Sequence, residues 1–294
     1  PASALVAAAL GLFPVILVLA ADVSVRCEGS WSMPFGSLIL EVDALSAVFA
    51  GPILVISALS ALFGSAYLRP FEGTKRLGLS WFLFHLLTAS MLVVVTARNA
   101  VLFLLAWELM TLASFFLVMF DHEKASVRRA GWTYLVATHI GTAFLLVMFL
   151  LLGCRTGSLD FASFGPVAGA AGGGAIFLLA VVGFGTKAGL MPMHIWLPEA
   201  HPAAPSHVSA VMSGVMIKTG IYGLIRVLMF LGSPPAWYGW TLLGIGAVSG
   251  VLGVLFALAQ HDLKRLLAYH SVENIGIITI GLGVGMLGVT FGNG

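Results

Sequence analysis

Residues 181–199 read VVGFGTKAGLMPMHIWLPE, an apolar helical run that carries Lys187 and ends in residues that disfavour a helix. The glycines and prolines around and beyond this lysine are Gly183, Gly185, Gly189, Pro192 and Pro198. Because such residues interrupt helices, the run predicts a membrane helix that breaks or unwinds just after Lys187. Interrupted helices in transporters expose backbone groups to a cavity near the membrane middle, where ions are handled. An ordinary proline kink, satisfied by neighbouring helices, is the alternative.

The rest of the chain has the composition of a membrane protein. Of 294 residues, 60% are hydrophobic and 9% are charged, whereas about a quarter of the residues in a soluble domain carry charge. The net charge of +2 comes from scattered Lys and Arg rather than from a basic run, so nothing indicates a nucleic-acid partner. The surrounding solvent is therefore predicted to be a lipid bilayer.

Hydropathy predicts about nine transmembrane helices within a single membrane domain, residues 1–294. The predicted bounds are 4–21, 45–68, 78–97, 100–120, 131–152, 175–196, 206–230, 240–260 and 271–290. Backbone groups in lipid must bond within their own segment, and an alternation of period two is missing from the sequence. The predicted fold is all-α, a polytopic transmembrane helical bundle with a broken helix.

The charged loops predict how the chain is oriented in the membrane. If loops alternate between the two sides, Arg26, Arg98 and Arg155 fall on one side. The larger group falls on the other side: Arg69, Lys75, Arg76, Lys124, Arg128, Arg129, Lys264 and Arg265. By the positive-inside rule the larger group faces the cytoplasm, which is the orientation expected of a multi-pass protein of the cell inner membrane.

Three predicted spans carry an ionisable residue near the middle: Glu108, Lys187 and Lys218. Such a residue costs about 2.5–3.5 kcal/mol on insertion scales, so it normally faces a partner or a water-filled cavity. Burial and nearby charge shift proton affinity, and these groups are therefore candidate proton carriers. Glu108 and Lys187 are predicted to form an ion pair that tunes the lysine. The alternative is that these charges only hold helices together.

His207 lies eleven residues before Lys218, which in a regular helix returns to the same face roughly 16 Å along the axis. We therefore predict a polar route through both residues, with the Ser213 and Thr219 hydroxyls able to hold bridging water. A hydrogen-bonded interface histidine is the alternative for His207.

Other polar residues and motifs carry weaker predictions. His139, His270 and Glu273 are possible additions to the pathway, whereas His85 is expected to bond across helices. The spacing of His194, Glu199, His201 and His207 matches no compact ligand motif, so no metal site is predicted. Without a phosphate loop, a dinucleotide fingerprint or a cysteine cluster, no cofactor is expected in this chain. Gly281 and Gly285 are predicted to pack against a neighbouring helix.

Several longer motifs resemble the antiporter-like subunits of respiratory complex I and of membrane hydrogenases. They are GTKAGLMPMHIWLPEAHPAAPSHVSA (185–210), MSGVMIKTGIYGLIR (212–226), HDLKRLLAYHSVENIG (261–276) and the tripeptide Trp107-Glu108-Leu109. Within that superfamily they are most similar to the hydrogenase-4 component B and formate hydrogenlyase subunit 3 type. The resemblance covers most of the chain and is weakest before Leu45.

The resemblance implies a fold and a role for each matching residue. Glu108 matches the family's channel glutamate, Lys187 the lysine of the broken helix, Lys218 the lysine of the next helix, and His207 a position between half-channels. The family has about fourteen core spans in two inverted repeats. This chain would hold one half of that inverted-repeat fold, without the first family helix and the C-terminal part.

The predicted function is proton translocation in a redox-driven complex of the hydrogenase-4/formate hydrogenlyase or complex I type. The chain would then be a membrane subunit of an oxidoreductase complex, with no redox centre of its own. Its partners would be other membrane subunits and a peripheral redox arm of hydrogenase or dehydrogenase subunits. A subunit of a multisubunit sodium/proton antiporter and a membrane scaffold that anchors a catalytic arm are the two alternatives.

Overall fold

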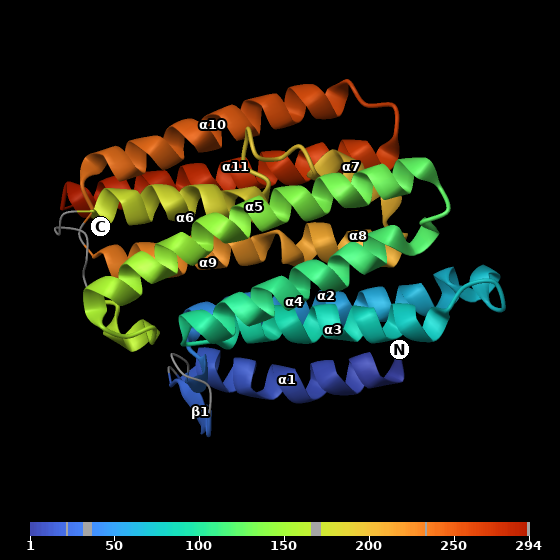
Figure 1. Cartoon of the computed structure of the whole chain (residues 1–294), viewed down its shortest axis with the longest axis horizontal. Helices are drawn as coiled ribbons and strands as arrows, with labels where there is room; N and C mark the ends of the chain where they lie inside the picture. Colours follow the sequence, from blue (N-terminus) through green and yellow to red (C-terminus); the bar gives the residue numbers. More distant parts are fainter. Residues whose placement is uncertain (22, 32–36, 166–171, 233, 293–294) are drawn as a thin grey trace. The chain divides into compact units, whose positions relative to one another are not determined.

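The computed structural model describes residues 1–21, 23–31, 37–165, 172–232 and 234–292. Contacts within the chain define two compact units. Unit 1 comprises Pro1–Leu135 and Ala200–Thr219, and unit 2 comprises Val136–Glu199 and Gly220–Gly294. Long helices make up most of each unit, and Figure 1 labels them along the chain.

Unit 1 is built on four N-terminal helices, in which α1 packs on α2 and α3 packs on α4. Its complete elements are α1 (Ala2–Ala21), β1 (Val25–Gly29), β2 (Leu38–Val42), α2 (Ala44–Tyr67), η1 (Arg69–Phe71), α3 (Leu77–Thr96), α4 (Ala100–Val118), η2 (Met119–Asp121), α8 (Ser206–Val211) and η4 (Met212–Met216). Three helices begin in one unit and end in the other: α5 (Ala125–Thr156), α7 (Leu197–Ala203) and α9 (Lys218–Leu231).

A β-hairpin follows α1, although the sequence predicted no strand. Strands β1 and β2 pair antiparallel, with Cys27 opposite Leu40. The hairpin is joined to the α3–α4 turn by Arg98, whose backbone N–H donates to the Ile39 carbonyl at 3.0 Å. The Arg98 guanidinium also lies 3.1 Å from the Asp43 carboxylate. Ten residues of pairing are too few to give a clear alternating pattern, which explains why the strands were missed.

Unit 2 contains α6 (Gly173–Ala188), η3 (Phe161–Ser163), α10 (Ala236–Leu258) and α11 (Leu263–Thr290). Helices α10 and α11 lie side by side along their length (Figure 1). Their contact depends on glycines spaced seven residues apart, at positions 239, 246 and 253 of α10 and 276 and 283 of α11, where an added Cβ would meet backbone atoms of the other helix.

The prediction that Gly281 and Gly285 pack against a neighbouring helix is wrong within the described structure. A Cβ at either position would meet no atom within 4 Å. Both residues are exposed, because they lie on the face of α11 opposite the one that carries Gly276 and Gly283. Spacing alone did not reveal which face of the helix is buried.

Among the described residues, eight helices are long and apolar enough to cross a membrane. Helix α6 is also apolar but has only 16 residues, because it ends at Ala188 instead of continuing to residue 196. Helix α11 begins at Leu263, eight residues before the predicted span. The predicted all-α polytopic fold with a broken helix is confirmed, and the chain is a multi-pass membrane protein.

Candidate functional site

Lys187 lies in the last turn of α6 and is only 2% exposed. The helix ends because Gly189 adopts the left-handed conformation, with φ of 84°. The backbone N–H groups of Gly189 and Leu190 both donate to the Gly185 carbonyl at 2.9 Å, which closes the helix end. A side chain at position 189 would also collide with Leu197. The predicted break is therefore a true helix end, and the proline-kink alternative is wrong.

Two side chains hold the segment after the break in place. The indole Nε1–H of Trp196 donates to the Thr186 carbonyl at 2.8 Å, which satisfies a backbone group that the ended helix leaves free. The Ser249 hydroxyl of α10 accepts the Met191 backbone N–H at 3.0 Å. Sequence analysis assigned no role to either side chain. Trp196 lies within the motif of residues 185–210, which resembles the antiporter-like family, whereas nothing in the sequence singled out Ser249.

Glycines allow neighbouring helices to come close to the end of α6. A Cβ at Gly183 would lie 3.0 Å from the Gly141 carbonyl oxygen of α5. A Cβ at Gly220 of α9 would lie 2.7 Å from the Phe184 carbonyl oxygen and 2.9 Å from the Ala188 nitrogen. Lys187 is therefore enclosed where backbones approach closely, an arrangement typical of membrane helix interfaces.

The position of Lys187 is electrostatically favourable for a cation. The carbonyl end of a helix carries a partial negative charge, which stabilises a positive side chain in the last turn. Burial in hydrocarbon opposes the charged form of the same side chain. Lys187 is thus subject to two opposing effects, one that favours and one that disfavours its charged form.

His207 occupies the first turn of α8 and is 1% exposed. Its ring centroid lies 5.8 Å from that of Tyr67, 6.0 Å from Trp81 and 5.7 Å from Phe84. The ring fits because position 64 of α2 is a glycine, where a Cβ would lie 3.0 Å from two atoms of the imidazole. This aromatic pocket within unit 1 restricts how the imidazole can turn.

Lys218 begins α9 and is half-buried. Its ammonium group donates to the Ser213 carbonyl, inside the wide π-helical turn η4 (Met212–Met216). The widened turn leaves carbonyls accessible to such a donor, and turns of this kind are frequent at functional sites. The nearby Thr219 hydroxyl donates to the Met216 carbonyl at 2.7 Å.

The π turn corrects the predicted geometry of His207 and Lys218. The prediction that both lie on one helix face assumed 3.6 residues per turn throughout residues 207–218. η4 interrupts that regular winding, so the shared face no longer follows from the spacing of eleven residues. A local departure of this kind leaves no mark in the hydrophobic pattern.

Glu108 lies in the middle of α4 and is half-buried beside the fully buried Trp107. The start of α4 is capped by Asn99, whose side-chain oxygen accepts the Val101 N–H at 2.9 Å. Glu108, His207 and Lys218 belong to unit 1, whereas Lys187 belongs to unit 2. The ion pair between Glu108 and Lys187 stays a prediction.

The weaker pathway candidates lie at several places in the chain. His139 is exposed on α5, and His270 on α11 lies 2.6 Å from the Glu273 carboxylate. His85 of α3 forms a 3.1 Å hydrogen bond with Ser3 of α1, as expected of a residue that bonds across helices. Among the described residues, no group of three or more His, Cys, Asp or Glu side chains is arranged to hold a metal ion.

Comparison with known proteins shows the family. Residues 97–291 match the family described as "NADH:quinone oxidoreductase/Mrp antiporter, TM". The chain is 42% identical over 292 residues to hydrogenase-4 component B of Escherichia coli, covering 98% of this chain and 43% of that protein. It therefore belongs to the antiporter-like membrane subunit family of NADH:quinone oxidoreductases, membrane hydrogenases and Mrp antiporters.

Further relatives agree with this family. Formate hydrogenlyase subunit 3 of Escherichia coli is 36% identical, covering 70% of this chain and 33% of that protein. A chain of the Mrp complex from Dietzia sp. DQ12-45-1b has a TM-score of 0.85 and 30% identity, covering 99% of this chain and 33% of that chain. An archaeal membrane-bound sulfane sulfur reductase chain has a TM-score of 0.81 and 28% identity, covering 98% and 48%. The present chain spans less than half the length of each of these relatives.

Proposed function

We propose that this chain is part of a proton-translocating subunit of a redox-driven membrane complex of the hydrogenase-4/formate hydrogenlyase or complex I type. The observation that carries the proposal is Lys187, a 2% exposed lysine in the last turn of an apolar helix that ends at the next residue, Ala188. Intramembrane ionisable residues mark ion pathways, and interrupted helices line them. The similarity to hydrogenase-4 component B supports the redox-driven type.

In this proposal Lys187 accepts and releases the translocated proton. Its ammonium form is favoured by the end of α6, and its neutral form is favoured by the apolar surroundings. Glu108 would favour the ammonium form when its carboxylate is near, and withdrawal of that charge would favour proton release. His207 and Lys218 would extend the route, with His139, His270 and Glu273 as possible additions.

The proposed partners follow from the relatives, which include subunits of multisubunit membrane complexes. Other membrane subunits would contact this chain, and a peripheral redox arm of hydrogenase or dehydrogenase subunits would hold the metals. The complex would lie in the cell inner membrane, with the basic loops on the cytoplasmic side. Redox chemistry in the partners would then drive changes at Lys187.

The decisive experiment measures redox-driven proton uptake by the full-length complex in vesicles, at equal levels of assembly. Lys187→Ala is expected to abolish pumping, because the carrier group is removed. Lys124→Ala is the matched control, since the Lys124 side chain is 67% exposed and lies outside the spans. Unchanged pumping by an intact Lys187→Ala complex would reject the carrier role and favour the membrane scaffold.

The ion pair between Glu108 and Lys187 needs a separate test. Each residue is neutralised alone and then both together, and the effects on pumping are compared as free energies. If the two residues are coupled, the loss of pumping in the double variant differs from the sum of the losses in the two single variants. Additive losses would reject the ion pair and leave Lys187 as an independent carrier.

A sodium/proton antiporter subunit is the second candidate, and the TM-score of 0.85 to the Mrp complex chain favours it. The same ionisable residues would then exchange sodium for protons without an oxidoreductase partner. Transport by the full-length assembly that requires sodium, but neither an electron donor nor an acceptor, would support this candidate. Proton uptake that depends on electron transfer and is indifferent to sodium would reject it.

A further inference from the structure

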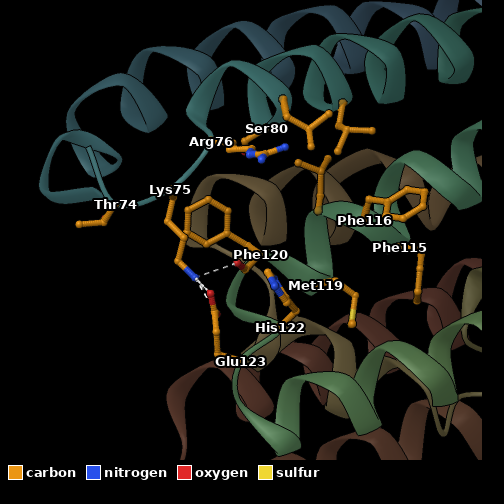
Figure 2. Close-up of a pocket in the computed structure, with 13 residues that line it drawn as sticks. Thr74, Lys75, Arg76, Ser80, Phe115, Phe116, Met119, Phe120, His122 and Glu123 are labelled. Atoms are coloured by element: carbon orange, nitrogen blue, oxygen red, sulfur yellow. Dashed lines mark hydrogen bonds and ion pairs between the residues drawn. The ribbon is translucent and has the colours of Figure 1, made fainter. Parts of the chain in front are cut away.

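An apolar groove lies in unit 1 between the start of α3 and the end of α4 (Figure 2). Its volume is about 830 Å³, within the ~300–1,000 Å³ range of ligand-binding pockets. Leu79 and Leu83 line it from α3, and Phe115, Phe116 and Leu117 line it from α4. The groove can therefore accept an apolar chain.

The charged residues at the mouth of the groove differ in what they contact. The Lys75 ammonium is already engaged, because it lies 2.7 Å and 2.8 Å from the two carboxylate oxygens of Glu123. The Arg76 side chain is exposed and lies beside Ser80, with its guanidinium away from the pair of Lys75 and Glu123 (Figure 2). Among the residues that the structure describes, its guanidinium forms no hydrogen bond or ion pair. Arg76 is thus available to bind an anion.

Ser80 provides an independent indication of a ligand. It lines the groove one helical turn after Arg76, on the same face of α3, and is 6% exposed. Its buried hydroxyl has no hydrogen-bond partner among the described residues. Buried hydroxyls are normally satisfied, and a serine within a helix usually bonds a carbonyl of the preceding turn. Because the Ser80 oxygen has almost no exposed surface, rotation of its short side chain would be needed to bring the hydroxyl to a ligand oxygen beside the anion.

The depth of the groove indicates where such a ligand would come from. α3 and α4 are both membrane-spanning candidates, and Arg76 directly precedes the first residue of α3. The groove therefore lies where hydrocarbon meets the headgroup region, on the side that the basic loops assign to the cytoplasm. Basic pockets between membrane helices on that side suit anionic headgroups.

We propose that this groove binds one anionic glycerophospholipid. Its phosphate would contact Arg76, and one acyl chain would lie against Leu79, Leu83 and Phe116. An ester oxygen would accept a hydrogen bond from the Ser80 hydroxyl. The ion pair between Lys75 and Glu123 closes the other side of the mouth. None of the residues that line the groove is a candidate for the proton pathway, so the lipid proposal can be tested independently of proton translocation.

A photo-crosslink identifies the occupant within the assembled full-length complex. The photoreactive analogue p-benzoylphenylalanine replaces Phe116 in the groove or, as a control, Phe82 of α3, which is 61% exposed and outside the groove. The probe at 116 is expected to form adducts enriched in phosphatidylglycerol over phosphatidylethanolamine, whereas the probe at 82 follows the bulk lipid ratio. Adducts at 116 with a protein chain, or in the bulk ratio, would overturn the proposal.

A retention measurement tests the role of Arg76. Native mass spectrometry of the detergent-purified complex compares retained phosphatidylglycerol in wild type, Arg76→Ala and Arg129→Ala, the last removing an exposed arginine outside the groove. Loss of one lipid-facing cation is expected to weaken retention about five-fold in Arg76→Ala and less than about two-fold in Arg129→Ala. Equal losses would overturn the proposal, as would displacement of the lipid by inorganic phosphate alone.

Discussion

Two lysines lie beside two different kinds of helix interruption. Lys187 is held at a true end, where α6 stops and the chain turns away through Gly189. Lys218 follows a π turn, where the helical path widens through Met212–Met216 and continues as α9. A helix end frees backbone groups that outside side chains must satisfy, whereas a wide turn presents a carbonyl to a side chain of the same segment.

This difference indicates how each interruption is stabilised. The end of α6 depends on side chains outside the helix. The indole of Trp196 and the hydroxyl of Ser249 bond the backbone at and after the helix end. The π turn depends on its own segment, since Lys218 donates to the carbonyl of Ser213, five residues earlier. We therefore expect substitutions at the α6 end to be more damaging than substitutions within the π turn.

The largest effect is expected for Gly189→Ala. Position 189 has a φ of 84°, and a Cβ there would collide with Leu197, so the free energy of unfolding should fall by about 2–4 kcal/mol. Gly157→Ala is the control, because its φ is 73° but a Cβ would meet nothing; its loss should be about 1–2 kcal/mol. Denaturation in sodium dodecyl sulfate measures both values. Equal losses would show that the contact with Leu197 does not matter.

Trp196→Phe should have the next largest effect. The substitution removes the donor to the Thr186 carbonyl and leaves space at a fully buried position. We expect the free energy of unfolding to fall by about 2 kcal/mol. Trp132→Phe, at a side chain that is 64% exposed, should change it by less than about 0.5 kcal/mol. A small effect at position 196 would mean that the helix end needs no outside donor.

Ser249→Ala should destabilise the protein more modestly. The Met191 N–H would lose its acceptor from α10, and polar contacts between membrane helices contribute about 0.6–1 kcal/mol. Thr241→Ala is matched to it on the same helix, since the Thr241 hydroxyl donates to the Trp237 carbonyl within α10 rather than to another element. Hydrogen exchange at the Met191 amide gives a local readout. Protection that survives in Ser249→Ala would contradict the assigned contact.

Gly214→Ala, inside the π turn, should be close to neutral. Its Cβ would lie 3.3 Å from two methyl carbons of Ile56, Cδ1 and Cγ2, so that Ile56 would have to shift by a few tenths of an ångström. That small clash opposes the gain from replacing a helical glycine, so the change should stay within about 0.5 kcal/mol. The same glycine-to-alanine change is thus expected to reduce stability at the α6 end but not in the π turn. A loss as large as that of Gly189→Ala would show that they are equally constrained.

The smallest effect on stability is expected from a third lysine, Lys75, which lies in the loop after η1. The hydrogen bond with Glu123 raises the pKa of Lys75, and the same bond lowers the pKa of the Glu123 carboxyl. The Lys75 contribution is present below its ordinary pKa of 10.5 and is lost as the pH rises through the raised value. The Glu123 contribution is present above its ordinary pKa of 4.5 and is lost as the pH falls through the lowered value.

Stability of the wild type should therefore decline slightly on going from pH 7 to below pH 4.5, with part of the decline caused by this pair. Lys75→Met removes the partner and should reduce the slope in that range. Unfolding in detergent at a series of pH values measures both slopes. If stability changed with pH in the same way in the wild type and in Lys75→Met, the ion pair between Lys75 and Glu123 would contribute nothing to the pH dependence.

Much of the architecture could be predicted from the pattern of apolar residues. The break after Lys187 was predicted because Gly189 and Pro192 act through the local backbone, and local effects are visible in sequence. The β-hairpin was missed because its strands are short and its link to Arg98 connects residues far apart in the chain. The packing face of α11 was missed because two sets of small residues, only one of them buried, occur on the same helix.

The sequence by itself determined that the chain lies in a membrane, that its helices carry a few costly ionisable residues, and that one helix breaks beside Lys187, because each of these follows from local composition and backbone preference. Only the tertiary structure decided which groups surround those residues. The aromatic pocket of His207 and the donor from Trp196 to the Thr186 carbonyl each depend on contacts between separate elements. Such contacts result from the packing of elements that are separate in the chain, and they leave no short pattern in the sequence.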